Sequence, residues 1–197
     1  MTTIDVYLVP KYDRTKSDFG EGDGFFVGQR VAEFLKKAAT SSGNIDDADF
    51  WWSGTSSGVA PIDLVCYVFD SIDQSLVAQH MRPGATLKSK AGNTVWSPKA
   101  QAMISEVYIA GAMYFAANLG QRDRVLAISI IHELMHNKLD LYPYKKGKSG
   151  FVTDLHATKG KAASQGITYF GDFYDDEDVK LMAAGIDHQI PQYTAAM

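Results

Sequence analysis

The sequence predicts one α/β (α+β) domain spanning residues 1–197, and three observations lead to this fold class. Strand-like and helix-like apolar patterns alternate over residues 1–140, which predicts a mixed sheet with helices. One segment in this part is apolar around nearly its whole helical circumference, which predicts a buried helix. The chain has 197 residues, 46% of them apolar and 12% aromatic, enough for one full core. We expect residues 141–197 to form a small C-terminal part of the same domain.

The first elements follow from local patterns. Residues 4–9 (IDVYLV) predict a strand that ends at Pro10, and the Gly- and Asp-containing stretch 11–24 predicts a loop. Apolar residues at helical spacing over residues 25–39 predict an amphipathic helix. Residues 41–61, rich in Gly, Ser and Asp, predict a second loop that contains Trp51 and Trp52. The apolar run 62–69 (IDLVCYVF) predicts a central strand.

The later elements are less regular. Residues 86–89 and 94–96 predict a hairpin that turns at Ala91-Gly92-Asn93, and residues 105–110 predict an edge strand. A helix over residues 98–118 is the alternative for this region. We expect Asp123 to cap the buried helix, which covers residues 124–139 and ends before Pro143. A short helix is expected from Asp176, with Gly185 after its end.

Charge and cysteine content exclude several classes of protein. The net charge of -4 argues against a nucleic-acid-binding protein, and no apolar stretch is long enough for a membrane span. The N-terminal residues show no signal-peptide pattern, so we expect a cytoplasmic protein or one exported without a signal peptide. The single cysteine, Cys66, allows neither an intrachain disulfide nor a cysteine-rich metal site. Any metal ion must therefore be held by His, Asp or Glu.

The buried helix contains the segment His132-Glu133-Leu134-Met135-His136, an H-E-x-x-H motif. Four residues advance a helix by about 400°, so the two histidines lie within about 40° of each other, one turn apart. Two imidazoles in this arrangement can ligate one zinc ion (Zn2+). Glu133 can instead face the metal-bound water and act as a general base. Chance predicts only about 0.003 such motifs in a chain with this many His and Glu residues.

This motif and its helical setting resemble the zincin metallopeptidases. The resemblance implies an α/β layer before the active-site helix and an edge strand that lines the cleft. In the metzincin subgroup a Gly and a third His follow the motif, but Leu139 and Tyr142 occupy those positions here. The resemblance is therefore to a metzincin-like or related subgroup in which the third ligand is displaced.

A catalytic zinc site normally has three protein ligands and one open position. His156 is our first candidate for the third ligand, because the loop that separates it from His136 is long enough to return to the helix. The carboxylates of Asp140, Asp154 and Glu177 are the alternatives.

The sequence thus predicts a zinc-dependent endopeptidase with Glu133 as the base and His132, His136 and His156 as metal ligands. Its expected partners are a protein or peptide substrate and, because proteolysis needs restraint, an inhibitor or a delivery partner. One alternative is a zincin-fold amidase that acts on cell-wall peptide. The other is a metal-dependent toxin-like or binding module without general proteolysis.

Overall fold

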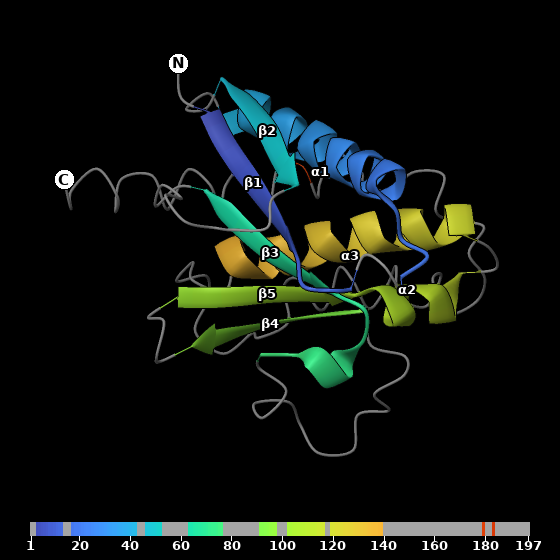
Figure 1. Cartoon of the computed structure of the whole chain (residues 1–197). Coiled ribbons are helices and arrows are strands. Elements are labelled where there is room, and N and C mark those ends of the chain that lie inside the picture. The colour runs from blue at the N-terminus through green and yellow to red at the C-terminus, as the bar shows by residue number, and fades with distance from the viewer. Residues whose placement is uncertain are drawn as a thin grey trace.

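A mixed five-stranded sheet forms the centre of the computed structural model (Figure 1). The structure describes residues 3–13, 17–42, 46–52, 63–76, 91–97, 102–116 and 119–139, together with Val179 and Ala183. The strand order is β2-β1-β3-β5-β4. Only β4 runs antiparallel to its neighbour, and the other pairs are parallel. The strands are β1 (Thr3–Pro10), β2 (Asp47–Trp52), β3 (Leu64–Phe69), β4 (Gly92–Ser97) and β5 (Ala102–Tyr108).

Two long helices, α1 (Glu21–Ser42) and α3 (Leu119–Leu139), pack together and against the sheet (Figure 1). Helix α1 packs mainly on β2, and α3 packs on β5 and β4. The short helix α2 (Ile109–Phe115) follows β5 directly and also packs on α3. Helix α3 therefore lies beside the sheet edge that β4 forms.

The main core lies between this sheet face and the two helices. Every second residue of a strand supplies one side of this core, because successive side chains in a strand point to opposite faces. Helix residues spaced by three or four supply the other side. The buried strand residues include Ile4, Val6, Leu8, Leu64, Cys66, Val68 and Val107, and the buried helix residues include Val27, Val31, Leu35, Leu126, Ile130 and Leu134. Burial of apolar surface contributes about 25 cal/mol per Å² to the free energy of folding. This burial is therefore the main favourable term for folding.

A smaller apolar cluster is formed by side chains of β3 and β5 that do not belong to the main core. It contains Phe69, Tyr108 and Ile72, with Tyr67 packed against it. Ile72 comes from a 3-10 turn (Ile72–Gln74) that directly follows β3. The segment after β3 therefore covers part of the sheet on this side.

Several predicted elements are confirmed. The strand at residues 4–9, the helix at 25–39, the central strand at 62–69 and the buried helix at 124–139 all form. Helix α1 begins earlier than predicted because the Asp23 carboxylate accepts a hydrogen bond from the Gly20 amide at 2.7 Å, a side-chain contact that stabilises a helix start. Helix α3 also begins earlier, at Leu119, so Asp123 lies inside it and is not its cap.

The strand predicted at residues 105–110 forms over residues 105–108, but its predicted place at the sheet edge is wrong. Strand β5 lies between β3 and β4, and residue 109 already begins α2. Its polar residues Ser105 and Glu106 are both fully buried, with internal hydrogen-bond partners. The sheet edge on this side is β4.

The predicted turn at Gly92-Asn93 is also wrong, because both residues pair with β5 as part of β4. Residues 86–89 lie outside the described residues. The alternative helix over 98–118 is excluded by β5, although α2 accounts for a piece of it. Residues 47–52, predicted as loop, form β2, which is stabilised by its parallel pairing with β1.

Most of the predicted C-terminal part lies outside the described residues. Val179 and Ala183 are helical and buried in the main core, as the helix expected from Asp176 predicts for these two positions. Within the described parts of the chain, no helix combines the length and apolar character needed to cross a membrane.

Candidate active site

The H-E-x-x-H segment lies in helix α3, as predicted. His132 is half-buried, and Glu133 is only 5% exposed. The helical backbone places residues 132 and 136 one turn apart. The side chain of His136 lies outside the described residues, as do His156, Asp140, Asp154 and Glu177.

The Glu133 carboxylate lies against the edge strand β4. Thr94 Oγ1 donates a hydrogen bond to Glu133 Oε2 at 2.6 Å and lies 3.0 Å from the Glu133 carbonyl oxygen. Short hydrogen bonds of this kind are typical of an acceptor that carries charge. A hydroxyl on the sheet edge thus contacts the residue that the motif predicts to be the base.

The neighbouring strand adds a second hydroxyl. Ser105 Oγ lies 3.3 Å from the Glu133 carbonyl oxygen and 3.1 Å from Thr94 Oγ1. Thr94 and Ser105 are opposite each other in the β4–β5 ladder, which explains why their hydroxyls meet. The two hydroxyls and Glu133 form one network between the sheet and α3.

Gly92 approaches Glu133 from the same strand. A Cβ atom at residue 92 would lie 2.6 Å from Glu133 Oε1 and 2.7 Å from its Cγ, closer than nonbonded atoms can come. The side chain of Glu133 therefore occupies the space that a larger residue would take. The local sequence pattern predicts a turn at Gly92 and does not identify Thr94, because a single Thr in a short strand carries no local signal.

Cys66 pairs with Ser105 in the β3–β5 ladder and is fully buried in the main core. Burial, with the nearby carboxylates of Glu133 and Glu106, raises the pKa of the Cys66 thiol well above its ordinary value. The thiol is therefore protonated and unreactive at neutral pH.

A second buried carboxylate, Glu106, lies in β5. It accepts hydrogen bonds from Ser75 Oγ at 2.5 Å, the Leu76 amide at 2.8 Å and Tyr108 OH at 2.8 Å. Burial raises the pKa of Tyr108, so its hydroxyl remains a donor. These bonds attach the segment after β3 to the sheet, and a charged residue within an otherwise apolar strand is the sequence signal that indicates such a contact.

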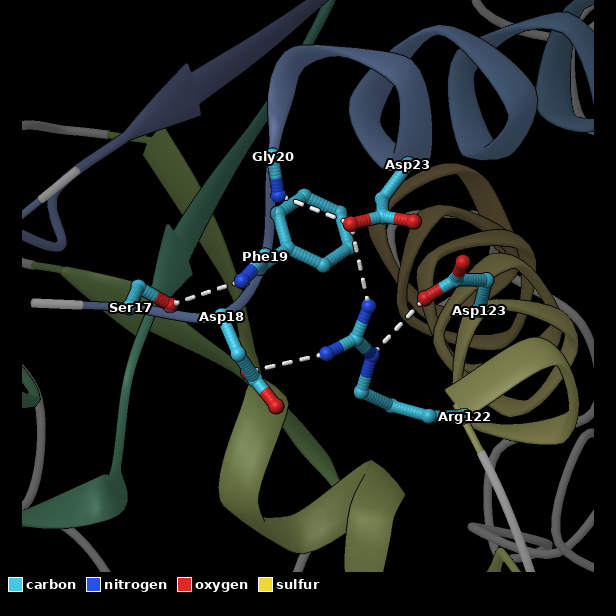
Figure 2. Close-up of polar contacts among 7 residues, drawn as sticks. All are labelled: Ser17, Asp18, Phe19, Gly20, Asp23, Arg122 and Asp123. Carbon is cyan, nitrogen blue, oxygen red and sulfur yellow. Dashed lines mark hydrogen bonds and ion pairs between the residues drawn. The ribbon is translucent and has the colours of Figure 1, made fainter.

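A third polar cluster surrounds Arg122 in α3, three turns before the motif (Figure 2). The guanidinium is 1% exposed and lies 2.8 Å from Asp123, 2.9 Å from Asp18 and 3.2 Å from Asp23. It also lies over the ring of Phe19, 5.0 Å from the ring centre. The cluster connects α3 to the segment before α1 and to the first turn of α1.

No three His, Cys, Asp or Glu side chains of the described residues form a group able to hold a metal ion. Of the predicted ligands, His132 alone has a described side chain.

Comparisons with protein-family models, with curated proteins and with solved structures found no match to this chain.

Proposed function

We propose that the protein is a zinc-dependent endopeptidase with a zincin-like fold. The observation that carries the proposal is the H-E-x-x-H motif in a helix whose glutamate lies against the edge strand of a mixed sheet. In this proposal His132 and His136 hold the metal, and His156 is the third ligand.

The chemistry of the available donors fits zinc. Two histidines at positions i and i+4 of one helix are a common pair of zinc ligands, and His132 is partly accessible. Glu133 has a hydrogen-bond partner on β4 for its carboxylate, which suits a base better than a ligand. The Cys66 thiol is not a competing ligand, because it is buried and protonated.

Glu133 has the role of general base and acid. Its carboxylate accepts a proton from the attacking water and later donates that proton to the amine of the leaving peptide. Zinc, when bound, lowers the pKa of water and polarises the scissile carbonyl.

Strand β4 replaces the strand at 105–110 as the proposed substrate-binding edge. It pairs with β5 on one side, and no described strand pairs with its other side. An extended peptide can add to such an edge through backbone hydrogen bonds. Residues 92 and 94 of this strand contact Glu133, so a peptide bound there would lie close to the base.

The experiment compares zinc-loaded wild type with Glu133→Gln on a quenched-fluorescent peptide library and on peptidoglycan fragments. Glu33→Gln, on the exposed side of α1, is the matched control. We expect wild type and Glu33→Gln to cleave library peptides, and Glu133→Gln to retain zinc but lose roughly 10²–10⁴-fold in rate.

Other outcomes separate the alternatives. Cleavage of peptidoglycan fragments alone would assign a cell-wall amidase. Zinc binding without hydrolysis of either substrate would assign a binding or toxin-like module. Full activity of Glu133→Gln would remove Glu133 from the mechanism.

A further inference from the structure

The edge strand contacts Glu133 at two positions that lie two residues apart, Gly92 and Thr94. Alternate residues of a strand point to the same face, so both positions are on the face of β4 that meets α3. Thr94 contacts Oε2 of the carboxylate, and a Cβ atom at residue 92 would lie 2.6 Å from Oε1. Each carboxylate oxygen therefore has its own neighbour on one strand.

We propose that Thr94 and Gly92 are positioning residues for Glu133, with the Thr94 hydroxyl orienting the carboxylate and Gly92 leaving the space that it occupies. The catalytic meaning of this arrangement rests on the proposed function, whereas the arrangement itself does not.

The count of protons supports the assignment to Thr94. A threonine hydroxyl has one proton, and two acceptor-only groups compete for it: Glu133 Oε2 at 2.6 Å and the Glu133 carbonyl oxygen at 3.0 Å. The shorter contact, to the carboxylate, takes the proton. Ser105 Oγ, 3.3 Å from the carbonyl oxygen, supplies a hydrogen bond there.

Ser105 thus determines which acceptor the Thr94 hydroxyl bonds. Because Ser105 serves the carbonyl oxygen, the Thr94 proton is left for the carboxylate. Thr94 also lies on a strand that is paired to β5 along its length, so the donor itself is fixed by the sheet. A carboxylate held by a rigid donor needs little rearrangement when it acts.

Gly92 contributes by its lack of a side chain. The three atoms nearest to an added Cβ, at 2.6 to 3.0 Å, all belong to the Glu133 side chain. We therefore expect an alanine at residue 92 to displace the Glu133 side chain. Gly weakens a strand, so its presence at residue 92 is explained by the space that the Glu133 side chain occupies.

The experiment uses zinc-loaded full-length protein in five variants. Thr94→Val removes the hydroxyl at constant shape, Thr94→Ser keeps it, and Gly92→Ala fills the space beside Glu133. The controls are Thr3→Val, at an exposed position of β1, and Gly22→Ala, in α1, where an added Cβ would meet no atom within 4 Å. Zinc content, thermal unfolding, crystal structures, and kcat and KM on library peptides are measured for each.

We expect Thr94→Val and Gly92→Ala to lower kcat by about 10- to 100-fold with zinc content and KM unchanged, because a displacement of about 1 Å has such an effect on catalysis. Their crystal structures should show the Glu133 carboxylate displaced from its place beside Thr94. Thr94→Ser should keep both the wild-type position and the wild-type rate, and so should the controls.

A Glu133 carboxylate that stays in place in Thr94→Val and Gly92→Ala would overturn the proposal. Equal kcat losses in Thr94→Val and Thr94→Ser would also overturn it, since only a general structural role would treat the two alike. If wild type cleaves no peptide, the proposed function fails, and the crystal structures alone decide whether these residues hold Glu133. If Thr94→Val does not fold, Gly92→Ala and Thr94→Ser supply the same comparison.

Discussion

The Arg122 guanidinium donates a hydrogen bond to the Asp18 carboxylate at 2.9 Å, although 104 residues separate them in the sequence (Figure 2). Arg122 is fully buried, whereas the Asp18 side chain is 67% exposed. The same guanidinium pairs with Asp123 beside it and with Asp23 in α1. The start of the helix that carries the H-E-x-x-H motif is thereby joined to the start of α1.

The first prediction concerns Arg122. Arg122→Met keeps much of the side-chain volume but leaves the carboxylate of Asp123, which is 9% exposed, without its cation. Loss of one partner of a buried ion pair destabilises a protein by about 3–5 kcal/mol. We expect the variant to lose about 3 kcal/mol of unfolding free energy in urea, because Asp18 can be hydrated.

Arg30→Met is the matched control for this measurement. Arg30 pairs with Glu33 on the surface of α1 at 3.4 Å, with both side chains more than two-fifths exposed. Such pairs contribute about 0–1 kcal/mol. Equal losses in the two variants would show that burial of Arg122 has no special importance.

The second prediction concerns the pH dependence of stability. Burial raises the pKa of Asp123 to about 6, with Arg122 opposing this shift and a hydrogen bond with Asp23 adding to it. The folded state therefore binds this proton more tightly than the unfolded state, whose Asp pKa is about 3.9. The resulting stabilisation is complete below about pH 4 and is lost as the pH rises through about 6.

Asp123→Asn tests this prediction. Asparagine does not titrate, and its amide can accept from Arg122 and donate to Asp23. Between pH 4 and 7 the unfolding free energy of the variant, relative to wild type, should rise by about 2 kcal/mol. Parallel stability curves for the two proteins from urea titrations across this range would contradict the assignment.

The third prediction concerns metal content. Wild type should bind about one zinc ion per chain, and His136→Ala should bind none, since loss of one imidazole leaves too few ligands. His188→Ala, at a histidine not assigned to the site, should keep its zinc. Elemental analysis after gel filtration measures the zinc content of each protein. Zinc retained in His136→Ala would exclude the motif as the metal site.

The fourth prediction concerns the third ligand. A tetrahedral site favours a ligand that arrives from another direction than the helix, and the glycines at 147 and 150 let the chain turn back. We therefore expect His156→Ala to weaken zinc affinity far more than Asp140→Ala, as measured by competition with a chelator. Asp140 is expected to orient a zinc-binding histidine, with an effect of about 10- to 100-fold or less. The reverse order would assign an aspartate ligand.

The strands and helices with strong local patterns were predicted from the sequence. Apolar residues around nearly the whole helical circumference of residues 124–139 predict a buried helix. That helix places Glu133 between two histidines one turn apart. The apolar run at 62–69 predicts a strand covered on both faces, and β3 is the middle strand of the sheet. Such patterns are local, because each residue contributes through the geometry of its own element.

The tertiary structure alone decided which strand is at the edge and which residues contact Glu133. Strand pairing joins distant segments, and the polar residues of β5 are buried because Ser75, Leu76 and Glu133 supply partners that are 28 or more residues away. The contact between Thr94 and Glu133 spans 39 residues, and that between Arg122 and Asp18 spans 104. No local periodicity encodes such contacts, since they depend on how separately formed elements pack.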